Sequence, residues 1–462
     1  MSNRLLSISP IDGRYHKNVK VVSNYFSEYA LIKYRIFVEI SYYITLIKTL
    51  KEKNEKLPIP INNGVHSMID VFNIITSFNI DNAISIKEIE KVTLHDVKAV
   101  EYFITKLECI DYPSMVHFGL TSQDINNVSL TLMVKNFIQD ILTNELYTLQ
   151  KLICDVSLSW LEHTIISKTH GQSASPTSLG KEFAVFLERI ISQIKNLNNS
   201  IYSTKFGGAV GNFNAHLIAY PNINWLEFAD NFIELIGLKR QQFTTQIEHY
   251  DELASIFNTL SRISIILIDL CRDVWLYISM GYFKLKTNPN EIGSSTMPHK
   301  VNPIDFENAE GNLMYAVSIF DFISRKLPIS RLQRDLTDST VSRNIGVPMA
   351  HMLLSIKNII KGINKLEPNI EVIERDINNN NIVISEGIQT ILRREGHLNA
   401  YEIIKDATRG KDINEMNTII SDLNVSDTLK EELYNINVYN YIGFNEVNLE
   451  NEVNLADNVN LE

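Results

Sequence analysis

The sequence predicts an all-α protein. Glycine and proline, which commonly end helices, are absent from residues 120–170 and again from residues 238–280, and gaps of this length favour long helices. Within the first gap, apolar residues recur at three- to five-residue steps, which is typical of one face of a helix. These residues are Leu130, Val134, Phe137, Ile141, Leu146, Leu149, Ile153, Val156 and Trp160. The chain shows no alternation of strand and helix patterns of the kind that builds a parallel sheet.

Three regions follow one another along the chain. Residues 1–111 read as helices with polar connections, residues 112–364 contain the long helices, and residues 365–462 contain shorter helices and a low-complexity tail. The helix expected over residues 251–279 is apolar nearly all round, and such a helix is buried against several neighbours. A homo-oligomer is the natural way to cover faces that a single chain leaves open.

The composition argues against several classes of protein. A net charge of −11 disfavours a nucleic-acid-binding protein that relies on a basic face. Cys109, Cys154 and Cys271 are far apart and form no CxxC pair, which excludes a disulfide framework and suits a reducing compartment. The N-terminal residues show no apolar segment of a secretory signal, and the apolar residues 260–280 carry four charges, unlike a membrane span. We therefore expect a cytoplasmic protein with no nucleic-acid or membrane partner.

Four polar segments interrupt the helical sequence. They are TLHDVKAVEYF (93–103), HFGLTSQDINN (117–127), SKTHGQSASPTSLGKE (167–182) and GSSTMPHKVNP (293–303). The sequence contains no GxxxxGK[ST], no HExxH and no cluster with metal-ligand spacing, so we expect no cofactor and no metal. The glycine-rich FGGAVGNFNAH (206–216) lacks the full dinucleotide fingerprint and follows a helical segment, so we interpret it as a turn.

Helix capping accounts for part of these segments. By themselves, His95 and Asp96 read as a helix start with Asp96 as the local cap, and Asn302 is expected to cap a helix that has Pro303 in its first turn. The segment from residue 121 offers more short polar side chains than a cap needs. This surplus suits an anionic ligand, because free N–H groups and the helix dipole favour negative charge there. Capping does not explain Gly-Ser-Ser followed by Met, His and Lys.

Together, the four segments resemble the fumarase/aspartase superfamily. GSSTMPHKVNP matches the superfamily signature GSSxMPxKxNP at every fixed position, and its MPHK part resembles the adenylosuccinate lyases among these enzymes. The resemblance extends over nearly the whole chain. The matching motifs are SPIDGRY (9–15), HDVKAVEYF (95–103), TSQDINN (121–127), THGQ (169–172), GAVGNFNAH (208–216), TTQIE (244–248), DFENAEGNL (305–313) and RDLTDSTVSRN (334–344).

This resemblance implies a fold and a reaction. The fold has three helical domains, and its central bundle forms a homotetramer in which each active site draws on three subunits. The reaction is carbon–nitrogen bond cleavage in purine nucleotide biosynthesis: adenylosuccinate gives AMP and fumarate, and the carboxamide ribotide SAICAR gives AICAR and fumarate. Both are β-eliminations, in which a base removes the proton next to a carboxylate and an acid protonates the leaving nitrogen.

Residue by residue, the resemblance also implies the roles of the site residues. Ser294 would be the general base and His170 the general acid. Because a serine hydroxyl is a poor base, Ser294 would act as an alkoxide supported by the helix start and Lys300. The carboxylates of the succinyl group would be held by Thr121, Ser122, Ser295, Lys300 and Asn302. Contacts on the phosphate side would come from Arg14, Tyr15, Arg334, Ser339 and Arg343. Further polar contacts would come from His95, Asp96, Gln246 and Asn308.

Four positions depart from the family pattern. Gln123 stands where relatives usually have glutamate, Ser173 and Gly387 stand where proline is common, and Leu94 stands where a polar residue is more usual. None of the four is the implied acid or base, so we expect an active enzyme.

Two histidines receive no role in the implied reaction, and two alternative functions compete with it. His216 and His249 are expected to be structural, with their polar groups satisfied inside the bundle. One alternative is another superfamily lyase, such as argininosuccinate lyase; MPHK and the arginine-rich residues 334–343 favour the adenylosuccinate enzyme instead. The other is a non-catalytic helical scaffold, against which the presence of both His170 and Ser294 argues.

Overall fold

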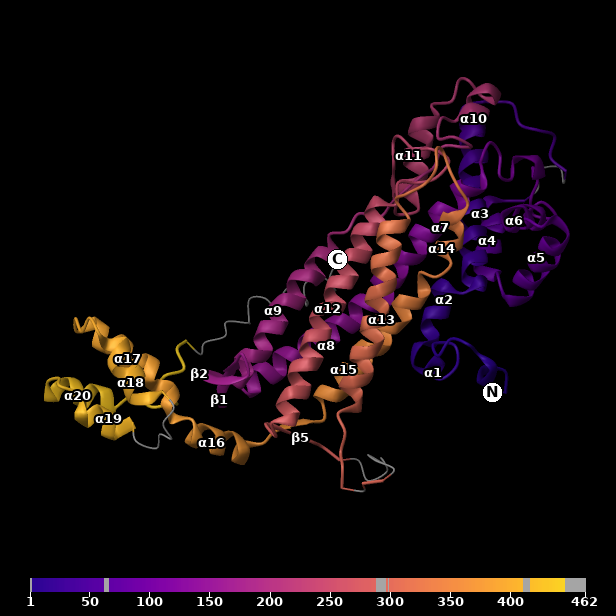
Figure 1. Cartoon of the computed structure of the whole chain (residues 1–462). Coiled ribbons are helices and arrows are strands. Elements are labelled where there is room, and N and C mark those ends of the chain that lie inside the picture. The colour runs from indigo at the N-terminus through magenta and orange to yellow at the C-terminus, as the bar shows by residue number, and fades with distance from the viewer. Residues whose placement is uncertain (1, 62–65, 288–295, 298, 410–415, 445–462) are drawn as a thin grey trace. The chain divides into compact units, whose positions relative to one another are not determined.

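The computed structural model describes residues 2–61, 66–287, 296–297, 299–409 and 416–444. They form two compact units, each assembled from three stretches of chain. Unit 1 comprises Met1–Glu145, Gln193–Ile265 and Asn312–Ser355, and unit 2 comprises Leu146–Ser192, Ile266–Gly311 and Ile356–Glu462. In the described part of the chain, helices dominate and the strands form only two-stranded pairs, so the predicted all-α class is confirmed (Figure 1). The division into three domains at residues 111 and 364 stays a prediction.

Unit 1 is built mainly around the long helix α3. Its elements are η1 (Ser2–Leu6), α1 (His16–Val19), η2 (Lys20–Val22), α2 (Ser23–Phe26), α3 (Glu28–Glu52), α4 (Met68–Ser77), α5 (Ile80–Thr93), α6 (Asp96–Ile104), η3 (Pro113–Met115), α7 (Ser122–Phe137), η4 (Ile138–Leu142), β3 (Ser203–Thr204), α10 (Asn214–Ala219), α11 (Trp225–Leu235), β4 (Lys239–Arg240) and α14 (Thr337–Ser342). Ser27 caps α3, because its hydroxyl accepts a hydrogen bond from the backbone N–H of Ala30 at 3.1 Å. Helices α3, α6 and α7 pack together in this unit (Figure 1).

The largely aliphatic core of unit 1 contains an aromatic cluster. Tyr42 on α3 packs against Phe206 and against Phe228 and Phe232 of α11, with ring centroids 5.6–6.0 Å apart. All four rings are buried. Such contacts fix α3 and so position the start of α3 and the helices beside it, where the polar residues described below converge.

Five long helices contribute residues to both units. They are α8 (Thr143–Ser159), α9 (Leu179–Asn198), α12 (Asp251–Ser279), α13 (Ile304–Lys326) and α15 (Gly346–Ile363). The helix predicted over residues 251–279 is confirmed as α12. Among the described residues it is the one helix long and apolar enough to cross a bilayer, yet 61% of its apolar window is buried within the protein, as in a core helix. Trp275 and Leu276 of α12 and Phe322 of α13 nevertheless stay exposed in the single chain.

Unit 2 contains the remaining elements. They are β1 (Thr164–Thr169), β2 (Gln172–Ser178), β5 (Phe283–Leu285), β6 (Leu366–Pro368), α16 (Ile370–Asn379), η5 (Asn381–Ile384), α17 (Ser385–Arg394), α18 (Ala400–Thr408), α19 (Met416–Asp422) and α20 (Asp427–Tyr434). Strands β1 and β2 form an antiparallel hairpin, and β5 pairs antiparallel with β6. Trp160, Phe183 and Phe283 pack ring to ring in this unit, with centroids 5.0–6.0 Å apart.

Two boundaries differ from the sequence prediction. The helix predicted in the glycine- and proline-free residues 120–170 is confirmed through α7, the π-helical turn η4 and α8. The prediction is wrong after Ser159, because residues 164–169 form strand β1. The β-branched run Thr164-Ile165-Ile166 favours a strand without any glycine or proline. Helix α13 begins at Ile304, one residue later than predicted. The Pro303 carbonyl accepts hydrogen bonds from the backbone N–H groups of Phe306 and Glu307 in the first turn of this helix.

Candidate active site

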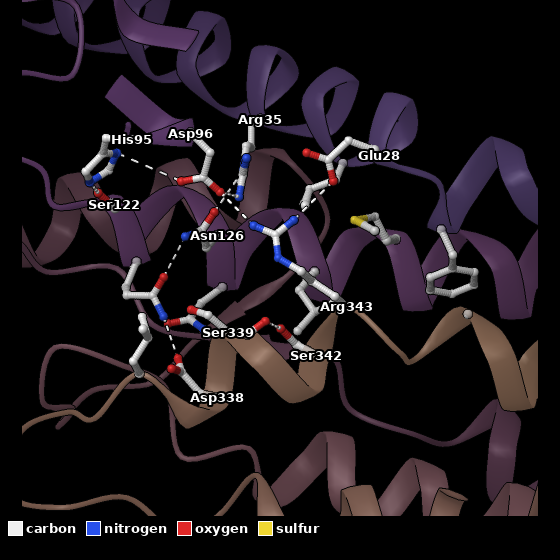
Figure 2. Close-up of a pocket in the computed structure, with 18 of the residues that line it drawn as sticks. Glu28, Arg35, His95, Asp96, Ser122, Asn126, Asp338, Ser339, Ser342 and Arg343 are labelled. Carbon is white, nitrogen blue, oxygen red and sulfur yellow. Dashed lines mark hydrogen bonds and ion pairs between the residues drawn. The ribbon is translucent and has the colours of Figure 1, made fainter. Parts of the chain in front are cut away.

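A polar pocket of about 410 Å³ lies in unit 1 (Figure 2). Its wall comes from the start of α3, the α5–α6 junction, the start of α7, and α14. Six residues predicted from three separate sequence motifs line it: His95, Asp96, Ser122, Arg334, Ser339 and Arg343. The structure therefore brings together side chains that are as far apart in sequence as positions 95 and 343.

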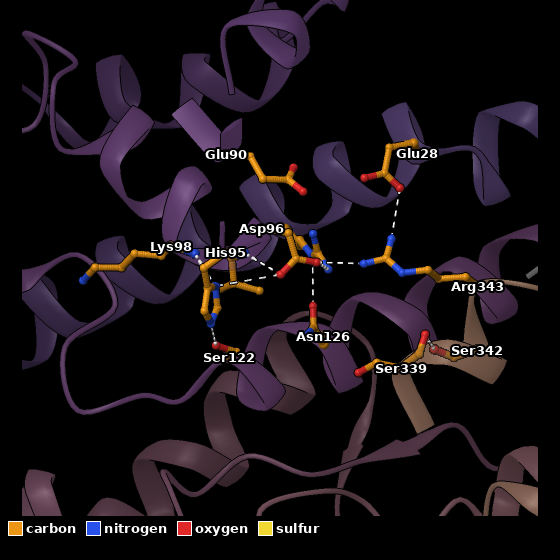
Figure 3. A network of polar contacts seen from close by, with 12 residues as sticks. Glu28, Glu90, His95, Asp96, Lys98, Ser122, Asn126, Ser339, Ser342 and Arg343 are labelled. Atoms are coloured by element: carbon orange, nitrogen blue, oxygen red, sulfur yellow. Dashed lines mark hydrogen bonds and ion pairs between the residues drawn. The ribbon is translucent and has the colours of Figure 1, made fainter. Parts of the chain in front are cut away.

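His95 and Asp96 stand at the start of α6. The ring nitrogen Nδ1 of His95 accepts a hydrogen bond from the backbone N–H of Lys98 at 3.2 Å, so His95 is the cap and the prediction of Asp96 as the cap is wrong. The physical reason is that two arginines engage the carboxylate of Asp96. With Nδ1 accepting, a neutral His95 ring carries its proton on Nε2, which lies 3.5 Å from the Ser122 hydroxyl (Figure 3).

Asp96 joins two arginines. Its Oδ2 accepts hydrogen bonds from Arg35 at 2.7 Å and from Arg343 at 2.9 Å. Burial opposes the charge of Asp96, but Arg35, the backbone N–H of Val97 and Arg343 outweigh it and lower the pKa of this carboxyl to about 2. Asp96 is therefore ionised throughout the physiological range.

Arg343 is held between two carboxylates (Figure 3). It donates to Asp96 and, through its other terminal nitrogen, to Glu28 at 3.1 Å. Glu28 in turn pairs with Lys87 at 3.1 Å. Sequence reasoning missed Glu28 and Arg35: neither belongs to a matched motif, and no local pattern marks them as partners of Asp96 and Arg343.

A second chain of hydrogen bonds forms the opposite wall. Gln123 donates to Asp338 at 2.6 Å, and Tyr250 donates to the same carboxylate oxygen at 3.3 Å. Arg334 donates to Ser339 at 3.1 Å and to Gln246 at 3.2 Å, which places the predicted Gln246 beside the pocket. The amide of Gln123 suits this position, because it can donate to a buried carboxylate where a second carboxylate could not.

Leu94 also lines the pocket, and its backbone is unusual. It ends α5 in the left-handed region, with φ 51°, and its side chain is 87% exposed. A leucine is unfavourable in that region, where glycine and asparagine are preferred. The departure from the family pattern at this position therefore places a strained apolar residue at the pocket edge.

Most of the glycine-rich segment 206–216 is a turn, as predicted, although its last three residues begin helix α10, and the turn encloses a buried ion pair. The carboxylate of Asp124 accepts from Lys205 at 2.6 Å and from the backbone N–H groups of Gly207 and Gly208. Both charged side chains are fully buried. Asp124 also accepts from the backbone N–H of Thr121 at 2.8 Å, which fixes the start of α7 beside Ser122.

The two histidines expected to be structural differ. His216 is fully buried; its Nε2 lies 3.2 Å from the Tyr42 hydroxyl, but its Nδ1 has no hydrogen-bond partner among the described residues. The prediction of a fully satisfied His216 is therefore wrong for one nitrogen, because aromatic rings surround it. Burial lowers the pKa of His216 to about 4. His249 is exposed, and its Nε2 contacts the Phe243 carbonyl at 2.6 Å.

Arg14 and Tyr15 do not line the pocket. Both precede α1 in unit 1, and the Arg14 guanidinium lies over the Tyr15 ring at 5.9 Å from its centroid.

The remaining predicted residues belong to unit 2. His170 occupies the exposed turn between β1 and β2. Lys300 is exposed, Asn302 is half-buried, and Asn308 on α13 accepts a hydrogen bond from Asn358 at 2.6 Å. Ser294 and Ser295 lie outside the described residues.

Comparisons with known proteins cover almost the entire chain. Residues 13–318 match the family model described as "Lyase", and residues 330–442 match the one described as "Adenylosuccinate lyase C-terminal". The adenylosuccinate lyase of Dictyostelium discoideum is 49% identical over 456 residues, which cover 96% of this chain and 97% of the relative. That of Escherichia coli (strain K12) is 41% identical over 447 residues, covering 95% and 97%.

Solved structures share the fold. A fumarate lyase from Mesorhizobium sp. BNC1 aligns with a TM-score of 0.70 at 14% identity, over 95% of this chain and 97% of that one. The 3-carboxy-cis,cis-muconate lactonizing enzyme from Pseudomonas putida aligns with a TM-score of 0.71 at 18% identity, over 96% and 98%. The identity to the curated relatives, sustained over both family models, shows that the chain belongs to the adenylosuccinate lyase family.

Proposed function

We propose that the chain cleaves adenylosuccinate to AMP and fumarate, and SAICAR to AICAR and fumarate, with His170 as general acid and Ser294 as general base. The observation that carries the reaction is the similarity to adenylosuccinate lyases across 95–96% of the chain. As a member of this family, the chain is a carbon–nitrogen lyase connected with purine nucleotide biosynthesis.

The pocket of unit 1 supports binding of an anionic substrate. Arg334 and Arg343 offer planar guanidinium groups, which suit a phosphate because they donate in pairs, and Ser339 lies beside Arg334. Ser122 opens α7, so the N–H groups and dipole of that helix favour a carboxylate next to its hydroxyl. His95 directs an Nε2–H donor toward the same place.

The proposed chemistry needs one base and one acid. Ser294, as an alkoxide, would take the proton from the carbon next to a carboxylate, and the negative charge would spread into that carboxylate. Lys300, Asn302 and Ser295 would stabilise this charge. His170 would then give its proton to the leaving nitrogen as the carbon–nitrogen bond breaks. No cofactor enters this scheme.

The assembly belongs to the proposal too. The exposed side chains of Trp275 and Leu276 on α12 and of Phe322 on α13 support a homo-oligomer that covers them, and we propose a homotetramer with shared active sites. Arg14, Tyr15 and Asn308 would then contact substrate in the assembled enzyme. Three free cysteines agree with a cytoplasmic location.

A substrate panel tests the proposed reaction. Purified protein is supplied separately with adenylosuccinate, SAICAR and argininosuccinate, and fumarate release is followed. We expect fumarate from the first two substrates and none from the third. Release from argininosuccinate alone would replace the proposal by the other lyase, and release from none would favour a non-catalytic scaffold.

A further inference from the structure

We infer that Lys168 is a positioning residue, which holds the turn that carries His170 by tying both strands of its hairpin to α16. The inference rests on the proposed role of His170 as general acid. It concerns only unit 2, to which Lys168, the hairpin and α16 all belong.

The turn that carries His170 is tight. Thr169 pairs with Gln172, so His170 and Gly171 alone connect the strands, and both have left-handed backbones, with φ 52° and 73°. Two-residue turns of this kind favour glycine and asparagine at both positions, and a histidine there is uncommon. Such a conformation persists only where its surroundings hold it.

Lys168 holds the hairpin one residue before Thr169, which is the last strand residue before the turn. It stands directly opposite Ser173 in the register of the hairpin, and its ammonium group donates to the Ser173 hydroxyl at 3.0 Å. The same ammonium group pairs with Asp376 on α16 at 2.9 Å. One side chain therefore connects β1, β2 and a helix that packs against β1 (Figure 1).

Asp376 is itself fixed on both oxygens. Its Oδ2, which faces Lys168, also accepts a hydrogen bond from the Tyr282 hydroxyl, and its Oδ1 accepts one from Asn380 at 2.9 Å. The Tyr282 ring is buried in the aromatic cluster of the unit and stacks on Tyr277. The ammonium group of Lys168 thus meets a carboxylate that cannot turn away without breaking other contacts.

The hairpin needs such ties because its backbone register is interrupted. The register shifts between Ile166 and Lys168, so the regular ladder does not run unbroken to the turn. A second tie lies on β2, where the Ser175 hydroxyl donates to Glu386 at 2.5 Å and Tyr441 donates to the same carboxylate at 2.7 Å. This second tie holds β2 two residues farther from the turn than Ser173, the residue that Lys168 contacts.

The test separates positioning from direct contact with substrate. If Lys168 acts through the hairpin, Lys168→Met and Asp376→Asn both lower kcat for fumarate release from adenylosuccinate by about tenfold or more, with KM changed by less than about threefold. The double variant is then no worse than the single variants, because both remove the same tie. Amide protons of residues 164–178 exchange faster in each, and Lys168→Arg, which retains the charge, restores most of kcat.

Controls make each result decisive. Arg394→Met removes an exposed ion pair with Glu432 in the same unit, at the opposite end of α17 from Glu386, and should leave kcat unchanged. Unchanged kcat in both Lys168→Met and Asp376→Asn overturns the inference, as does a loss in Lys168→Met that Asp376→Asn does not share. His170→Ala is measured in parallel: if it stays active, the proposed acid is wrong, whereas an inactive His170→Ala beside a fully active Lys168→Met removes only the positioning role.

Discussion

The carboxylate of Asp96 accepts a hydrogen bond from Arg343 at 2.9 Å while the buried Arg35 donates to the same oxygen at 2.7 Å. Arg343 is thereby oriented by a residue from another part of the sequence before any phosphate arrives. The same Asp96 carboxylate therefore contributes to the stability of unit 1 and orients an arginine that is proposed to contact the substrate phosphate.

Substitution of Asp96 should therefore affect stability. Asp96→Asn leaves the Arg35 guanidinium buried without a charged partner and is expected to cost about 3 kcal/mol, seen as a lower urea midpoint. Glu88→Gln, which removes an exposed pair with Lys91, is the control and should cost less than about 0.5 kcal/mol. Equal midpoints for Asp96→Asn and the parent would show that the buried pair contributes nothing.

Arg343 is expected to contact only the phosphate end of the substrate. Arg343→Lys loses the paired donors of the guanidinium and is expected to weaken inhibition by AMP at least about tenfold, because hydrogen bonds to charged groups contribute roughly 1.5–3 kcal/mol. Inhibition by fumarate, which carries no phosphate, should change little. The control Arg331→Met removes a guanidinium that is 83% exposed and is not part of the pocket lining. Equal weakening of AMP and fumarate would contradict a phosphate-side role.

Buried His216 should make stability depend on pH. Burial lowers its pKa to about 4, whereas the unfolded side chain titrates near about 6.5. Between these values the unfolded state binds more protons than the folded state, so stability falls as the pH decreases through this window. We expect His216→Gln to flatten the dependence of the urea midpoint on pH between about 6.5 and 4. The same change at exposed His299 is the control, and an unaltered slope in His216→Gln would rule out this source.

Leu94 offers a stabilising substitution. Leu94→Asn places a residue suited to φ 51° at the end of α5 and removes no buried side chain, so a gain of about 1 kcal/mol is expected, seen as a higher melting temperature. Leu94→Val, a β-branched residue that tolerates this backbone worse, should lower the melting temperature. A lower melting temperature for Leu94→Asn would mean that the leucine side chain makes a contact it does not make in the single chain.

Much of the fold could be predicted because its signals are local. The helix of residues 251–279 is visible in composition alone, and the short motifs mark the pocket residues. The partners of these residues could not be predicted, because Arg35 and Asp96 lie 61 positions apart and Arg343 and Glu28 lie 315 apart. Only the packing of α3, α6 and α14 brings them together.

The hairpin that carries His170 shows a different limit. The absence of glycine and proline before residue 171 predicts a helix, yet the β-branched residues at 164–166 form a strand. Helix breakers mark only some helix ends, and here the strand preference of the side chains decided the structure.

The central claim is that His170 and Ser294 carry out the elimination, and one measurement addresses it most directly. Fumarate release from adenylosuccinate is compared for the parent protein, His170→Ala, Ser294→Ala and an equimolar mixture of the two variants after reassembly. We predict that each variant loses at least about a hundredfold in kcat, and that the mixture regains part of the activity as intact sites form between subunits. Activity near that of the parent in either single variant would contradict the assignment of that residue.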